Sequence, residues 1–78
     1  MNKLVINEWI SMKEQLAKNN ATEEESIEAI REFMNTHSKE EFDKIIEINF
    51  IAGLKFLSGQ YEGIPFLELV RLEFESEE

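Results

Sequence analysis

The chain has 78 residues, of which 17 are acidic and eight are Lys or Arg, so its formal net charge at pH 7 is -9. A surface with this much negative charge repels nucleic acid and anionic lipid and attracts basic protein surfaces. We therefore expect a basic protein surface as partner, and no direct nucleic-acid or membrane partner. The lack of cysteine excludes disulfides and thiolate metal sites, and a hydrophobic content of 42% is too high for a disordered chain.

Length and the absence of long apolar runs predict one small domain spanning residues 1–78. A domain of this size buries roughly 60% of the surface that its unfolded chain exposes, which leaves little stability to spare. The apolar run 4–6 is too short for a signal-peptide core, and no stretch approaches the roughly 20 apolar residues of a membrane span. We therefore expect a cytoplasmic protein.

The first predicted element is an amphipathic helix from Leu4 to Lys18. Its apolar residues recur with helical spacing, and Asn19-Asn20 can end it because Asn tolerates the left-handed conformation. Trp9 lies on the apolar stripe, which favours a place in the core over a role as an interface anchor. The stripe comprises Val5, Trp9, Met12 and Leu16.

Two capping boxes predict where the next two helices begin. In 22–25 and again in 38–41, a hydroxyl residue is followed three positions later by Glu, so side chain and backbone can satisfy each other. Helices should therefore open at Glu23 and Lys39. The first of these should continue to about Thr36, with an apolar stripe made of Ile27, Ile30, Phe33 and Met34.

The third helix should be the centre of the fold. Nine of the thirteen residues in 45–57 are apolar, which is typical of a helix surrounded by others. Gly53 lies inside it, where Gly is about 1 kcal/mol less favourable than Ala, so we expect it to admit a close neighbour or a bend.

The end of the chain is ambiguous. Residues 58–63 predict a loop, and Pro65 can occupy the first turn of a fourth helix. Residues 70–75 also alternate as a strand would, but a lone strand has no pairing partner, so helix is preferred. The expected fold is all-α, a small compact bundle of three main helices plus a shorter C-terminal helix, with 75–78 as a frayed acidic tail.

The sequence predicts no enzyme, because the residues that catalysis requires are scarce. The single His37 follows the second helix and suits a solvent-exposed or capping role, and no orienting group for a catalytic triad is identifiable. Di-metal helical bundles use Glu-x-x-His, but Met34 stands three residues before His37. We expect no catalytic site, no metal site and no cofactor.

The acidic residues divide into those that helix starts explain and those that remain. Acids in the first turns of the second and third helices are stabilised by the helix dipole. Glu25, Glu28 and Glu32 share one exposed face of the second helix, and we name these three residues the acidic ridge. A second acidic group closes the chain, where the dipole disfavours anions: Glu73, Glu75, Glu77 and Glu78. A solvated tail and a patch for a basic groove both remain open for it.

Tyr61 lies in a glycine-flanked loop, and an exposed Tyr there is typical of an interface hot spot, although it can equally pack under the loop. The candidate partner-binding residues are therefore Tyr61, the acidic ridge and the four acids at the chain end. The favoured hypothesis is that the protein is a small inhibitor or regulator that masks a basic surface of a target protein. If the target binds nucleic acid, the acidic residues would imitate the negative charge of the phosphates. An immunity protein or antitoxin that binds a basic toxin would depend on the same electrostatic attraction. The alternative is a homo-oligomer with the apolar third helix at the subunit interface.

Overall fold

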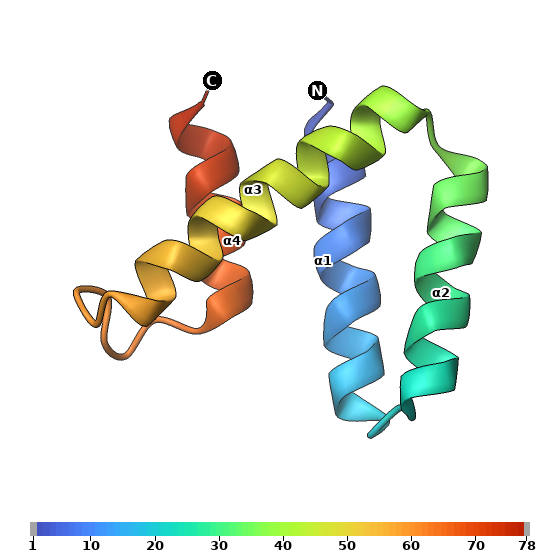
Figure 1. The fold of residues 1–78 in the computed structure, drawn as a ribbon, viewed down its shortest axis with the longest axis horizontal. Coiled ribbons are helices and arrows are strands. Elements are labelled where there is room, and N and C mark those ends of the chain that lie inside the picture. Colours follow the sequence, from blue (N-terminus) through green and yellow to red (C-terminus); the bar gives the residue numbers. More distant parts are fainter. Residues whose placement is uncertain (1, 78) are drawn as a thin grey trace.

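The computed structural model describes residues 2–77 and contains four helices in that range: α1 (Lys3–Lys18), α2 (Glu23–Thr36), α3 (Lys39–Leu57) and α4 (Phe66–Ser76). In Figure 1, α1 and α2 form a hairpin, while α3 runs across α1 and α4. The molecule measures 33 × 29 × 17 Å, so it is flattened. The predicted all-α class and the helical fourth element are confirmed.

Local signals place the helix ends. Both predicted capping boxes are present: the Thr22 and Ser38 hydroxyls each accept from the backbone amide of the third helical residue at 3.1 Å. The carboxylates of those residues, Glu25 and Glu41, accept in return from the cap amides at 2.9 and 3.1 Å. Asn20 takes the left-handed conformation with φ 51° in the turn after α1, as its position predicts.

The hydrophobic core lies where the first half of α1 meets α3 and α4. Among residues 2–77, Phe33 is the buried hydrophobic residue of α2, and none in α1 follows Ile10. The far half of the α1–α2 hairpin therefore projects from the core. The buried hydrophobic residues are Val5, Ile6, Trp9, Ile10, Phe33, Ile45, Ile48, Ala52, Leu69, Val70 and Phe74.

Trp9 is a core residue, as predicted, and is only 3% exposed. Its ring meets Phe33 of α2 and Phe42 of α3 edge-on, with centroids 5.3 and 6.2 Å away, and the Lys13 ammonium lies 5.8 Å from its centroid. Within the described part of the chain its buried indole N–H has no hydrogen-bond partner. One side chain thus joins three helices through aromatic packing.

The prediction that other helices surround α3 is wrong for half of its circumference. Ile45, Ile48 and Ala52 are fully buried, but the opposite side is open because so short a chain supplies helices for only one side. The outward face of α3 consists of Ile46, Phe50, Leu54 and Leu57. The apolar stripe of α2 is likewise half open, since Ile27 and Met34 remain exposed.

The loop before α4 turns at Gly59 and Gly63, whose φ values of 77° and 85° favour glycine. Pro65 is the N-cap of α4, one residue before the first-turn position that the sequence predicted. The helix continues through Ser76, so Glu75 is helical rather than part of a frayed tail. Glu78 lies outside the described residues.

Candidate functional site

The acidic ridge lies on exposed surface of α2. Glu25, Glu28 and Glu32 are all exposed, and none of the ion pairs found among residues 2–77 includes them. The capping hydrogen bonds from the backbone and side chain of Thr22 lower the pKa of Glu25, so this carboxylate stays ionised in mildly acidic solution. The ridge is therefore a line of carboxylates open to solvent.

Glu24 extends this surface, although the sequence had assigned it only to the start of the helix. It precedes Glu28 by four residues, and Glu28 precedes Glu32 by four, so the three carboxylates follow one row along α2. The same i, i+4 spacing was available in the sequence as a signal. Arg31 is the single basic residue of α2, so the helix carries a strong local excess of negative charge.

The prediction that Glu73 belongs to a solvated acidic end is wrong. Glu73 is only 8% exposed, and its carboxylate accepts a hydrogen bond from the Lys55 ammonium of α3. This hydrogen bond raises the pKa of Lys55, although partial desolvation opposes it. Glu73 joins α3 to α4 and is not available to an external partner.

The remaining acids at the chain end differ from one another. The Glu77 carboxylate lies 3.2 Å from the Lys44 ammonium, and the hydrogen bond between them raises the pKa of Lys44. Glu75 is exposed and lies on the last turn of α4. The predicted terminal patch thus loses Glu73, while Glu77 is shared with α3.

Tyr61 is partly buried and packs against the hydrophobic core. Of the two alternatives that the sequence left open for this side chain, the structure supports packing under the loop. It is therefore a weaker candidate for an interface hot spot than its position in a glycine-flanked loop indicated.

His37 connects α2 to α1. Its Nε2 lies 2.8 Å from the Glu8 carboxylate, its Nδ1 lies 2.9 Å from the Phe33 carbonyl oxygen, and its ring stacks on Phe33 at 4.0 Å. Both ring nitrogens face acceptors, so the doubly protonated ring satisfies both contacts. The Phe33 carbonyl foremost, then Glu8 and Glu41, raise the pKa of His37 against the opposing effect of burial. This arrangement is a structural clamp.

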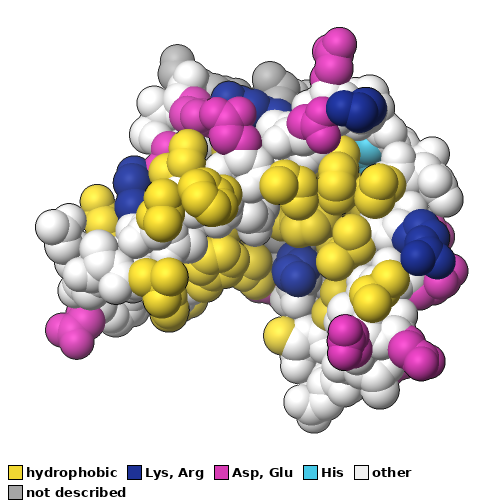
Figure 2. Space-filling model, in the orientation of Figure 1, with side chains coloured by type: hydrophobic (Ala, Val, Ile, Leu, Met, Phe, Trp, Pro, Cys, Tyr) yellow, Lys and Arg dark blue, Asp and Glu magenta, His cyan; other side chains and the backbone are white. Residues whose placement is uncertain are grey.

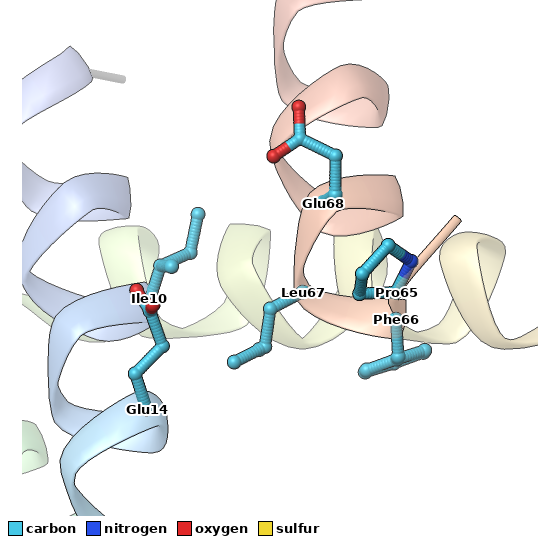
Figure 3. Close-up of a pocket in the computed structure, with 6 residues that line it drawn as sticks. All are labelled: Ile10, Glu14, Pro65, Phe66, Leu67 and Glu68. Atoms are coloured by element: carbon cyan, nitrogen blue, oxygen red, sulfur yellow. The ribbon is translucent and has the colours of Figure 1, made fainter. Parts of the chain in front are cut away.

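A cleft of ≈ 410 Å³ separates the middle of α1 from the start of α4. In Figure 3, Leu67 points across this gap toward α1, with Glu14 on one wall and Glu68 on the other. The Glu68 carboxylate is 3.1 Å from the Arg71 guanidinium. The lining is mainly apolar, and within residues 2–77 no group of three or more His, Asp or Glu side chains is placed to hold a metal ion.

No protein-family model, no curated protein and no solved structure matches this chain. In the part of the chain that the structure describes, every helix is too short or too polar to cross a membrane. The physical features of the surface therefore carry the functional argument.

Proposed function

We propose that this chain is a non-catalytic cytoplasmic module that binds a basic surface of a target protein through the acidic ridge of α2 and thereby masks it. The observation that carries the proposal is the row of exposed carboxylates on α2, which no ion pair among the described residues neutralises. Electrostatic attraction of this kind accelerates association and makes binding sensitive to salt.

The stability of the free protein does not explain why these carboxylates lie close together on α2. Like charges four residues apart destabilise a helix by about 0.2–0.5 kcal/mol per pair, and Glu28 with Glu32 is such a pair. Neither side chain contributes to a cap or to the buried core. A basic partner would relieve the repulsion, which gives the arrangement a benefit in the complex that it lacks in the free protein.

The spacing of these carboxylates also suits imitation of nucleic-acid charge. From Glu24 to Glu32 the helix axis advances about 12 Å, at 1.5 Å per residue, and carries four carboxylates. This is one negative charge per roughly 4 Å, close to the 3.4 Å per phosphate along one strand of DNA. We therefore propose that the masked surface is a nucleic-acid-binding surface.

Capture from a cell lysate tests the proposal directly. The immobilised wild-type chain is expected to retain a basic protein at low ionic strength and to release it as salt increases. The E28Q/E32Q variant should release the same protein at clearly lower salt. Duplex DNA added at constant ionic strength should compete with the wild-type chain for the captured protein.

The matched control is E40Q/E62Q, which changes the net charge by the same amount at two exposed positions outside α2. This control should retain the partner nearly as well as the wild type. Equal loss in both variants would show that total charge, and not the ridge, governs binding. Capture that persists unchanged in high salt would contradict the electrostatic mechanism altogether.

A further inference from the structure

The outward face of α3 is a hydrophobic surface that this chain leaves uncovered. Ile46, Phe50, Leu54 and Leu57 are 46%, 67%, 56% and 82% exposed, and all four lie on the side opposite the buried Ile45, Ile48 and Ala52. Figure 2 shows hydrophobic side chains gathered over α3 and, as a second group, over the α1–α2 hairpin, with most acidic side chains at the margins of this face. Four side chains at this exposure present on the order of 400 Å² of apolar surface, a size that often marks an interaction site.

Gly53 lies at the edge of this face, beside Phe66 of α4, and packing within the chain does not require it to be glycine. A Cβ at this position would meet nothing closer than the Phe66 ring at 3.9 Å, which is an ordinary contact. Alanine would therefore fit and would favour the helix. Because Gly53 has no side chain, it leaves a shallow place on α3 that a bulky group from outside the chain can approach closely.

The spacing of these residues is that of a helix-pairing seam. Ile46, Phe50, Gly53 and Leu57 follow one another at intervals of four, three and four residues, the pattern with which paired helices interlock. When two such helices run antiparallel about a two-fold axis between positions 50 and 53, the large Phe50 of each copy faces the small Gly53 of the other. The same register sets Ile46 against Leu57. The face is therefore complementary to itself.

Charge indicates a second copy rather than a basic partner as the occupant. Between Ile46 and Leu57 the charged residues of α3 are Glu47 and Lys55, which cancel. Glu47 lies 3.7 Å from Lys44, and Lys55 is engaged with Glu73. A basic protein would find no excess of negative charge here, whereas two copies can meet on this nearly neutral strip despite the charge of the rest of the molecule.

We propose that the outward face of α3 is a homodimer interface, in which two antiparallel α3 helices place Phe50 of each copy against Gly53 of the other. Two such faces contribute about 800 Å² of apolar area, and the residues around them supply the rest of the roughly 1,200–2,000 Å² that a specific interface buries. This inference does not rest on the proposed function, because the acidic ridge belongs to a different helix and stays free in the dimer.

Sedimentation equilibrium of the purified full chain, from low micromolar to about millimolar concentration, tests the proposal. The wild type should dimerise, and F50E should be monomeric across the range because it brings two carboxylates into the interface. L4E is the matched control, since Leu4 on α1 is 66% exposed and receives the same charge. It should dimerise like the wild type. Circular dichroism should show that both variants keep their helices.

Gly53→Ala distinguishes this register from others. The added methyl group should leave the monomer at least as stable, yet it should weaken the dimer about tenfold or more by displacing Phe50. In the double variant F50A/G53A the smaller side chain faces the methyl group, so the combined effect should be smaller than the sum of the single effects. Additive effects would overturn the antiparallel register.

A wild-type chain that stays monomeric at millimolar concentration would overturn the dimer, and so would a dimer that F50E leaves intact. If the chain is monomeric and F50E instead abolishes capture of another protein, the occupant of the face is that protein and not a second copy. Loss of capture by E28Q/E32Q with the dimer intact separates this inference from the proposed function.

Discussion

α2 and α3 begin with the same capping box but differ in what they present to solvent. α2 exposes a row of carboxylates and buries only Phe33 among its hydrophobic residues, whereas α3 exposes hydrophobic side chains and buries three residues on its other side. The caps decide where both helices start, and the outward faces decide what each helix can bind. A basic partner is proposed for the charged face of α2, and a second copy of the chain for the apolar face of α3.

The largest expected effect is the difference in stability loss between substitutions on the buried and on the exposed side of α3. Ile48→Ala should lower the free energy of unfolding by about 2–5 kcal/mol, because it opens a cavity at a fully buried position. Leu54→Ala should change it by less than about 0.5 kcal/mol in the monomer, because Leu54 is exposed. Urea denaturation of both variants in the F50E background measures this difference between monomers. Equal losses would mean that the outward face is covered within the chain.

The next largest effect is the loss of stability when either capping box is broken. Removal of either hydroxyl, in T22A or S38A, should cost about 0.5–2 kcal/mol. Because α2 is attached mainly through α1, T22A should raise amide hydrogen exchange in α2 while α3 stays protected. S38A should instead lower the protection of the whole core. Equal loss of protection in α3 for the two variants would contradict the view that the hairpin projects from the core.

The clamp between His37 and Glu8 predicts a dependence on pH. Because the folded-state pKa of His37 is raised above its ordinary value of about 6.5, its stabilisation is complete below that pH and is lost as pH rises through the folded pKa. The Tm should therefore fall as the pH rises through this range, and each kcal/mol of lost stability corresponds to a Tm change of about 4–8 °C at this size. Thermal melts between pH 6 and 8 measure it.

Two variants serve as controls for that titration. His37→Gln should remove the dependence, and Glu8→Gln should reduce it while the Phe33 carbonyl still holds the ring. An unchanged pH profile in His37→Gln would assign the titration to another group. The clamp acts on α2, so α3 should keep its amide protection throughout this pH range.

The smallest effect is the change in stability when exposed carboxylates are neutralised on α2 or on α3. E28Q/E32Q should raise the free energy of unfolding at low salt, by about 0.2–0.5 kcal/mol for each of the two like-charge pairs that it removes, Glu24 with Glu28 and Glu28 with Glu32. The gain should vanish at high ionic strength, where exposed charges are screened. Glu40→Gln should have the opposite sign, because it removes a carboxylate from the first turn of α3, where the dipole stabilises anions. A loss of stability in E28Q/E32Q would point to a structural role for the ridge.

The sequence predicted features that neighbouring residues determine. The starts of α2 and α3 follow from capping boxes that close over three residues, and the left-handed Asn20 follows from its own side chain. The exposure of the acidic ridge follows in the same way from its spacing on one helix. Contacts between distant residues escaped prediction: Glu73 pairs with Lys55 across 18 residues, and His37 pairs with Glu8 across 29.

The exposure of Phe50 escaped prediction for a different reason. Periodicity counts the hydrophobic residues around a helix, but it does not count how many helices are available to cover them. A four-helix chain of this length has covered only one side of α3. The hydrophobic content of the third helix thus predicted burial correctly for Ile45 and Ile48 and wrongly for Phe50.

The position of Trp9 gives the molecule an intrinsic optical probe. It is the only tryptophan of the chain and touches aromatic rings of α2 and α3 from its place on α1. Its fluorescence should therefore shift when the hairpin separates from α3, while melting confined to the far end of α4 should leave the emission unchanged. Comparing fluorescence with circular dichroism during unfolding would reveal whether the hairpin and the α3–α4 core separate in one step or in two.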